Sequence, residues 1–375
     1  MKGKQGLVCM GLLLVLSSCH TGKQITASGL QRKDFQTEVN GQHTDLFTLS
    51  NKQGMEVCIT NYGARVVSIL VPDRNGKRED VVCGFSTITE YMEQRQNFGS
   101  TVGRYIGRIL NARFTLDGVE YKLVPNNGKS GHISHGGNPG FADRIWKVEQ
   151  ADTHRVRLSY LSPDGENGFP GNLKVTLVYS LGEDDNALDL TYEATTDAPT
   201  VLNLSHHSFF NISGNFTKSV EDQQLWVDAD RFTPYDDKKC VTGEYLPVAG
   251  TPLDFRMPHT IGECIDADHP QLKVVNGYDH TWELKGDDTR PAAWVYDPAS
   301  GRKMEIFTTE PGMQIYTGNG LKGKMTGKGG IAYPFRSAVC FETMHFQDSP
   351  NQPGFPSTVL RPGEVFRSHT VYKFE

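Results

Sequence analysis

Hydrophobic and polar positions alternate with a period of two along much of this chain. The alternation is regular in RVRLSYL (155–161), LKVTLVY (173–179) and LDLTYE (188–193). Successive side chains of a β-strand point to opposite faces, so each segment predicts a strand with one buried and one exposed face. Turn-forming residues separate these segments, at PDG (163–165) and GEDDN (182–186).

Other segments extend this pattern. FTLDGVEY (114–121) predicts a hairpin, because Asp-Gly is a typical two-residue turn between short strands. Further strands are predicted at 56–60, 66–71, 225–228, 304–308, 339–342 and 371–374. The pattern predicts only one short helix, at 87–94. Many strands and few helices predict an all-β fold, a large antiparallel β-sandwich, and no linker composition divides residues 37–375, which we expect to form a single domain.

The N-terminal segment has a different character. Lys2 and Lys4 precede an apolar run at 7–16, which is shorter than the roughly 20 residues of a transmembrane helix. The following LSSC (16–19) resembles a bacterial lipobox, in which cleavage before the cysteine leaves its thiol to be acylated. We therefore predict a signal peptide at 1–18, lipidation of Cys19 and a flexible tether at 19–36. The alternative is a plain signal peptide with an incidental cysteine.

These N-terminal features also predict a location. The protein is expected to be exported and lipid-anchored to a bacterial cell envelope, at the periplasmic face or the cell surface. We expect contact with the membrane only through this anchor.

The formal net charge is −6 and no run of Lys or Arg occurs, which argues against a nucleic-acid partner.

Cysteines and acidic residues give little sign of a metal site. The chain has seven cysteines but no C-x-x-C pair, so neither a zinc site nor a disulfide scaffold is indicated. We expect the cysteines after residue 19 to be isolated buried thiols. The acidic pairs at 184–185 and 236–237 leave a structural Ca²⁺ open, although no EF-hand loop is present.

Several short segments concentrate polar and aromatic residues suited to binding and proton transfer. They are GRYIGRI (103–109), HISHGG (132–137), NLSHHSFFN (203–211), GYDH (277–280) and FET (341–343). Histidine and carboxylate side chains are common general acids and bases, and histidine has an unperturbed pKa of about 6.5. On an extended strand, only one of His206 and His207 can face a given cleft.

In this order, the segments resemble those of the aldose 1-epimerase (galactose mutarotase) family. EPGMQIYTGN (310–319) and FPSTVLRPGE (355–364) extend the resemblance over nearly all of residues 37–375. It implies the family's β-supersandwich and the interconversion of the α and β anomers of free hexoses such as glucose and galactose. No cofactor is expected, since ring opening moves no electron and handles no phosphate. The expected partner is a small aldose, and the expected state is a monomer.

The resemblance also implies roles for matched residues. His207 is the expected general acid at the ring oxygen, and Glu342 the general base at the anomeric hydroxyl. The expected substrate-binding residues are Arg108, His135, Ser208, Phe209, Asp279 and Gln314. Outside this motif series, each residue also has an ordinary structural interpretation, such as a core histidine or a salt-bridged carboxylate. The four tryptophans, at 146, 226, 282 and 294, are expected in the core, with Trp282 the best candidate for a sugar contact.

The sequence departs from the family pattern in three of its motifs. Ile106-Gly107 stand where the family commonly has Ala-Asn, Phe209 replaces Tyr, and Met344 replaces Gln. The expected acid and base are kept. A lost hydrogen bond to a sugar hydroxyl changes binding by about 0.5–1.5 kcal/mol. The departures therefore bear on the preferred aldose, which the sequence leaves open.

Three other functions compete with epimerisation. A non-catalytic carbohydrate-binding protein is compatible with the same fold, because fold does not fix function. A sugar-phosphate epimerase would need more basic residues than Arg104 and Arg108 near its site. A glycoside hydrolase would need a second catalytic carboxylate about 5–10 Å from the first, and Asp279 is the only candidate.

Overall fold

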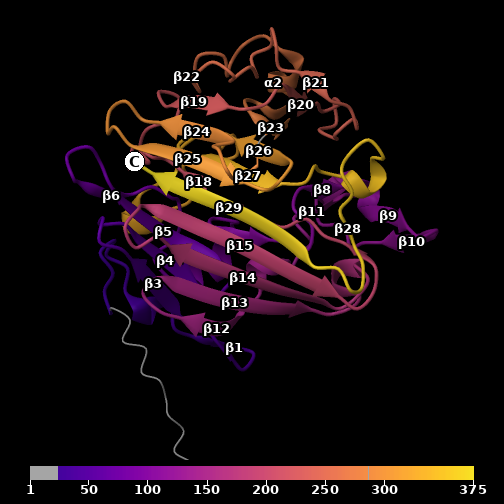
Figure 1. Ribbon diagram of the computed structural model, residues 1–375, viewed down its shortest axis with the longest axis horizontal. Helices are drawn as coiled ribbons and strands as arrows, with labels where there is room; N and C mark the ends of the chain where they lie inside the picture. The colour runs from indigo at the N-terminus through magenta and orange to yellow at the C-terminus, as the bar shows by residue number, and fades with distance from the viewer. Residues whose placement is uncertain (1–23, 286) are drawn as a thin grey trace, which may run out of the picture.

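The computed structural model describes residues 24–285 and 287–375. The predicted signal peptide and Cys19 lie outside the described residues. The all-β prediction is confirmed, with antiparallel pairing between the strands of every sheet (Figure 1). The chain builds a nine-stranded, a six-stranded and a four-stranded sheet, together with several two-stranded ones.

The nine-stranded sheet contains the clearest of the predicted strands. The C-terminal strand β29 crosses its middle, between β15 and β25 (Figure 1). In order across the sheet, the strands are β12 (Lys147–Ala151), β13 (Arg155–Ser162), β14 (Leu173–Leu181), β15 (Ala187–Thr196), β29 (Phe366–Phe374), β25 (Lys303–Thr308), β24 (Ala293–Tyr296), β19 (Gln224–Val227) and β22 (His259–Thr260).

Two smaller sheets complete the sandwich. The six-stranded sheet has the order β18 (Phe209–Phe210), β27 (Val339–Met344), β26 (Gly312–Tyr316), β23 (Asp279–Glu283), β20 (Arg231–Thr233) and β21 (Leu246–Pro247). The four-stranded sheet has the order β3 (Leu46–Ser50), β4 (Glu56–Thr60), β5 (Arg65–Pro72) and β6 (Arg78–Asp80). One hydrophobic cluster joins all three sheets, including Leu177 and Leu190 of the first, Ile315 and Phe341 of the second and Val57 of the third.

Short sheets and turns surround this core. The predicted hairpin is present as β9 (Arg113–Leu116) and β10 (Val119–Lys122), with Asp117 and Gly118 at φ of 51° and 80°. Positive φ at both central residues is the requirement of a type I′ turn. The other pairs are β1 (Glu38–Val39) with β2 (Gln42–His43), β7 (Ser100–Val102) with β17 (Ser205–His207), β8 (Arg108–Ile109) with β11 (Ile133–Ser134), and β16 (Thr200–Val201) with β28 (Val359–Leu360).

Helices are short. The predicted helix is present as α1 (Ile88–Gln94), and Thr87 and Glu90 form a capping box at its start. A second helix, α2 (Pro270–Val275), was not predicted. The 3-10 turns are η1 (Arg32–Phe35), η2 (Leu110–Ala112), η3 (Gly128–Ser130), η4 (Phe141–Asp143), η5 (Glu166–Gly168), η6 (Lys328–Gly330) and η7 (Ser349–Asn351). Within the described part of the chain, no helix has the length and apolar character needed to cross a bilayer.

The predicted tether is wrong for residues 24–36, which pack onto the domain. Leu30 and Phe35 are buried in a hydrophobic cluster. The Ala27 N–H donates to Glu56 Oε1 at 2.7 Å, and the Arg32 Nε–H donates to Asp45 Oδ1 at 2.8 Å. Burying one large apolar side chain is worth about 1.5–3 kcal/mol, which helps to offset the entropy lost on ordering the segment.

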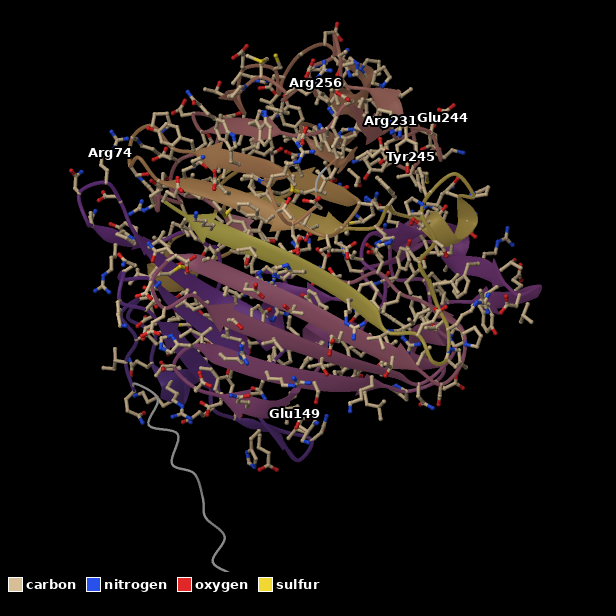
Figure 2. All side chains as sticks on the ribbon, viewed as in Figure 1. Arg74, Glu149, Arg231, Glu244, Tyr245 and Arg256 are labelled. Atoms are coloured by element: carbon tan, nitrogen blue, oxygen red, sulfur yellow. The ribbon has the colours of Figure 1, made fainter. Side chains whose placement is uncertain are left out.

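The outer surface is polar, as the alternation predicts. Charged side chains such as those of Arg74, Glu149 and Arg256 project from it (Figure 2). The tryptophan prediction holds for Trp146 and Trp282, which are fully buried. It is wrong for Trp226 and Trp294, which are half-buried and stack with ring centroids 6.4 Å apart. These two pair across β19 and β24, and their neighbours Leu225 and Val295 fill the core instead.

Candidate active site

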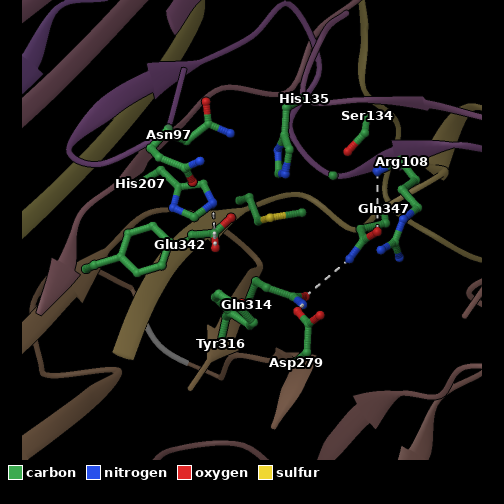
Figure 3. A pocket seen from close by; sticks show the side chains of 14 residues that line it. Asn97, Arg108, Ser134, His135, His207, Asp279, Gln314, Tyr316, Glu342 and Gln347 are labelled. Atoms are coloured by element: carbon green, nitrogen blue, oxygen red, sulfur yellow. Dashed lines mark hydrogen bonds and ion pairs between the residues drawn. The ribbon is translucent and has the colours of Figure 1, made fainter. Parts of the chain in front are cut away.

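A polar cavity of about 250 Å³ opens beside the six-stranded sheet (Figure 3). Ligand pockets usually have about 300–1,000 Å³, so this one suits a small ligand such as a single sugar ring. Seven of the eight sequence-predicted catalytic and substrate-binding residues line it, namely Arg108, His135, His207, Phe209, Asp279, Gln314 and Glu342. These residues come from segments separated by up to two-thirds of the chain, and the fold brings them together.

Strand register builds one wall of the cavity. Glu342 on β27 lies opposite Gln314 on β26, and Tyr316 on β26 lies opposite Asp279 on β23. Directly paired residues and residues two apart share one face of a sheet. All four side chains therefore face the cavity, while Ile315, between the two β26 residues, points into the core.

The two adjacent histidines face opposite ways, as predicted. His207 lines the cavity, and its ring stacks on Phe209 with centroids 5.0 Å apart and an interplanar angle of 15°. His206 points away from the cavity, where its Nε2 lies 2.7 Å from Ser208 Oγ and its Nδ1 lies 3.4 Å from the Tyr179 hydroxyl. His207 is thus the member of the pair that can meet a ligand.

His207 and Glu342 meet at the cavity wall. His207 Nε2 lies 3.4 Å from Glu342 Oε1, and their side chains are only 7% and 5% exposed (Figure 3). Burial raises the pKa of Glu342 well above its usual value, and the nearby Asp279 charge adds to this rise. Burial also lowers the pKa of His207 well below its usual value, with a further contribution from His135. Both shifts favour a neutral pair that holds one proton.

His135 stands on a tight turn after β11. Its φ is 52°, and a Cβ on the following Gly136 would lie 1.9 Å from the Gly103 carbonyl oxygen. The turn is therefore closely packed against Gly103 and requires glycine at 136. Burial, together with the Arg108 charge, lowers the pKa of His135 to about 4. The lowered pKa keeps the ring neutral, and its buried Nδ1 has no hydrogen-bond partner among the described residues.

Hydrogen bonds orient the polar groups on the other side of the cavity. Gln314 Oε1 accepts from the Thr281 hydroxyl at 2.5 Å, and Gln314 Nε2 donates to Asp279 Oδ1 at 2.6 Å. Burial raises the pKa of Asp279, while the Arg108 charge opposes that rise. Arg108 Nη1 donates to the Lys239 carbonyl at 3.0 Å, which holds the guanidinium at the cavity rim. These hydrogen bonds fix the orientations of Gln314, Asp279 and Arg108 around the cavity.

Ser208 does not take the place that the resemblance implies. It follows His207 on the chain, so its side chain points to the opposite face and does not line the cavity. The Tyr179 hydroxyl donates to the Ala64 carbonyl at 2.7 Å, so His206 Nδ1–H donates to Tyr179 and His206 Nε2 accepts from Ser208. A sugar contact for Ser208 is therefore not supported. Trp282 also lies away from the cavity, with its indole N–H on the Leu253 carbonyl.

Several lining residues were not among the predicted catalytic and substrate-binding residues. Met344 and Tyr316 lie two residues from Glu342 and Gln314, so the period of two could have found them. The others that bear side chains, Gln96, Asn97, Ser134 and Gln347, come from short or irregular segments without a sequence signal.

Among the described residues, one group of side chains has the chemistry to ligate a metal. Ligand atoms of His207, Cys340 and Glu342 lie within 4.8 Å of one another. Cys340 is fully buried and does not line the cavity, so it is not open to an incoming ion. Asp236 Oδ1 accepts two backbone N–H groups of its own turn at 2.9 Å, from Lys238 and Cys240. That the reaction needs no cofactor stays a prediction. A structural Ca²⁺ stays a possibility from the sequence alone.

Comparisons with known proteins give a consistent result. The family model described as Aldose 1-epimerase matches residues 45–373. Galactose mutarotase from Bos taurus is 41% identical over 329 residues, covering 88% of this chain and 93% of the bovine one. Aldose 1-epimerase from Escherichia coli K12 is 36% identical over 339 residues, covering 89% and 96%. The crystal structure of an aldose epimerase homologue from C. elegans is 31% identical, with a TM-score of 0.82 and coverage of 88% and 99%. The chain belongs to the aldose 1-epimerase family.

Proposed function

We propose that this protein interconverts the α and β anomers of free aldoses, including hexoses such as glucose and galactose. One observation carries the proposal: the buried His207–Glu342 pair, at 3.4 Å, lies on the wall of a cavity suited to one sugar ring. The names of the relatives support this reaction, since galactose mutarotase and aldose 1-epimerase both describe it.

The reaction needs one acid and one base at the anomeric carbon. His207 donates a proton to the ring oxygen while Glu342 removes the proton of the anomeric hydroxyl. The bond between the anomeric carbon and the ring oxygen breaks, and an aldehyde forms. Rotation about the adjacent carbon–carbon bond presents the other carbonyl face, and reversal of the proton transfers closes the ring. The reacting oxygens share one carbon, so a closely spaced acid and base fit this chemistry.

The proton count explains the pKa shifts of the pair. Protonated His207 with ionised Glu342 carries one proton, and so does neutral His207 with protonated Glu342. Ring opening converts the first arrangement into the second, and ring closure restores it. Burial favours the second, neutral arrangement, since it raises the pKa of Glu342 and lowers that of His207. The pocket therefore stabilises the protonation state that accompanies the open-chain sugar.

The pH dependence follows from this single shared proton. Activity is expected to fall at low pH, where a second proton binds, and at high pH, where the one proton leaves. Since the pKa of His207 is lowered, the acid limb should lie below pH 6.5, the usual histidine value. Polarimetric kcat/KM values across pH, corrected for buffer catalysis, would show a bell-shaped curve. An acid limb above pH 6.5 would contradict the neutral pair.

Polarimetry also tests the function itself. Freshly dissolved α-D-glucose and α-D-galactose should approach anomeric equilibrium faster with the protein than in buffer alone. Sugar binding by calorimetry without acceleration of any common aldose would instead indicate a carbohydrate-binding protein. Release of a smaller sugar from a glycoside, followed by chromatography, would indicate a hydrolase using Glu342 and Asp279.

We also propose that the protein is exported and held at a bacterial envelope by a lipid on Cys19. The LSSC sequence at 16–19 supports this. Expressed in a bacterium with radiolabelled palmitate, the full chain should carry the label and sediment with membranes. Cys19→Ser should lose both properties and leave the kcat of the enzyme unchanged, because the domain that holds the cavity is untouched. Label retained by Cys19→Ser, or an unlabelled soluble full chain, would reject the anchor.

A further inference from the structure

Gln347 is a polar cavity residue with no assigned role. It follows β27 on the chain, is 6% exposed and lines the cavity near Arg108 and Gln314 (Figure 3). Burying an amide is costly unless its hydrogen-bonding groups find partners. The buried Gln347 amide should therefore form hydrogen bonds with neighbouring residues, with a bound ligand, or with both.

The packing shows that Gln347 and Gly107 share one volume. Gly107 has a φ of 75°, and a Cβ built there would lie 2.5 Å from Gln347 Cγ and 3.1 Å from its Cδ. A side chain at position 107 would have to displace Gln347. The glycine thus makes room for the Gln347 amide. Position 107 is also where this sequence has glycine in place of the asparagine that is common in the family.

The hydrogen bonds hold the amide in place but leave part of its capacity unused. Gln347 Nε2 donates to the Tyr235 hydroxyl at 2.7 Å and lies 3.4 Å from Gln314 Oε1. Gln347 Oε1 accepts from the Arg108 N–H at the long distance of 3.3 Å, its one donor within the described residues. An amide oxygen accepts two hydrogen bonds and an amide nitrogen donates two. One acceptor site and the weakly used second N–H remain for a ligand.

The position of the amide relates it to one part of the sugar. In Figure 3, Gln347 and Arg108 lie on one side of the cavity, and His207 and Glu342 lie on the other. With the anomeric carbon next to the adjacent His207 and Glu342 side chains, the Gln347 amide faces hydroxyls farther around the ring. Such a contact is kept in the ground state and in the transition state, so it acts on binding and on the choice of sugar rather than on proton transfer.

From these observations we infer that Gln347 is a specificity-determining residue, whose amide binds a ring hydroxyl in the space that Gly107 leaves open. This inference rests on the proposed function for the identity of its ligand as an aldose. It assigns to position 347 the hydroxyl contact that an amide at position 107 would otherwise make.

The first test is Gln347→Ala, assayed on D-glucose, D-galactose and the monodeoxy-D-glucoses. Loss of one neutral hydrogen bond should lower kcat/KM about two- to twelvefold for sugars that carry the contacted hydroxyl, mainly through KM. For the deoxy sugar that lacks this hydroxyl, wild type and Gln347→Ala should have about the same kcat/KM. A uniform loss across all sugars, or no loss with any of them, would overturn the inference.

A matched control separates binding from folding. Gln352 lies five residues away and donates to Asp348 Oδ2 at 2.9 Å, outside the cavity. Gln352→Ala should therefore leave the order of sugar preference unchanged, even where it lowers the thermal stability. If Gln352→Ala changed the preference in the same way as Gln347→Ala, the effect would belong to the loop and the inference would fail.

The second test moves the amide back. Asparagine tolerates the positive φ of position 107, so the backbone should accept Gly107→Asn. This single variant should still impair sugar binding, because the new Cβ collides with the Gln347 side chain. The double variant Gly107→Asn/Gln347→Ala should recover part of the lost kcat/KM, so the two changes should be strongly non-additive. Additive losses in the double variant would show that the two positions do not share one hydroxyl contact.

The assay also distinguishes failure of the inference from failure of the proposed function. If wild type accelerates no aldose, the epimerase proposal fails, and sugar affinities from calorimetry replace kcat/KM as the readout. Discrimination between D-glucose and its deoxy analogues that disappears in Gln347→Ala would still support the hydroxyl contact. Equal affinities in wild type and Gln347→Ala would reject it.

Discussion

Replacing Glu342 with glutamine is expected to lower kcat by about 10²–10⁴-fold, while KM changes little. Glutamine keeps the size of the side chain and a group for His207 to contact, but it cannot take the proton of the anomeric hydroxyl. A positioned proton-transfer group contributes about this factor to a rate. Polarimetry with α-D-glucose or α-D-galactose gives kcat, after subtraction of the spontaneous rate. Calorimetry with the same sugar measures whether binding survives.

The control is a second buried carboxylate outside the cavity. Glu310 is 3% exposed, and its Oε2 lies 2.7 Å from His345 Nδ1. Glu310→Gln makes the same substitution at a buried carboxyl group and should lower the thermal stability, with kcat kept within about threefold of wild type. A Glu342→Gln variant that keeps more than about a tenth of the wild-type kcat would remove Glu342 from the role of general base.

Strands were easier to predict than helices in this chain. The predicted strand at 56–60 coincides with β4, and those at 155–161, 173–179 and 188–193 lie within β13, β14 and β15. Strands β13, β14 and β15 bury mainly one face, so alternation records their environment directly. Both faces of β4 are buried, and a short apolar run indicates it instead. Helix α2 was missed because its six residues are too few to show a helical period. The local signs were Pro270 in the first turn and Asn276-Gly277 at the end.

The active-site wall depends on pairings that a single sequence does not reveal. Glu342, Gln314 and Thr281 face one another because β27, β26 and β23 are neighbours in one register. That register follows from the packing of the whole sheet and its turns. The motif series could indicate Glu342 and Gln314 one by one. It could not indicate Gln347, which meets Gly107 only after the chain has folded.

In the N-terminal segment, the polar composition led to a wrong prediction of a flexible tether for residues 24–36. Residues 20–36 are mostly polar, which favoured a flexible tether throughout. Two apolar side chains, Leu30 and Phe35, decide the matter by entering the core next to β3 and β4. Average polarity does not detect isolated anchors of this kind, because their contribution depends on a complementary site elsewhere in the fold.

Replacing His207 with glutamine is expected to lower kcat by about 10²–10⁴-fold and to change the pH profile. Glutamine retains hydrogen-bonding atoms next to Glu342 but cannot protonate the ring oxygen. Since the second proton of the pair binds at low pH through the lowered pKa of His207, the acid limb of the profile should shift or vanish in this variant. A purely structural role would lower the amount of folded enzyme and leave the shape of the profile unchanged.

His206 is the matched control for His207, because it belongs to the same strand and faces the other way. His206→Gln disturbs the contacts with Ser208 and Tyr179, so its melting temperature should fall. Its folded fraction should keep a kcat within about threefold of wild type and an unchanged pH profile. Polarimetry of both variants across pH, normalised to folded protein by circular dichroism, measures the contrast. Equal kcat losses in the two variants would show that the strand needs both histidines for its structure, and the assignment of His207 as the general acid would fall.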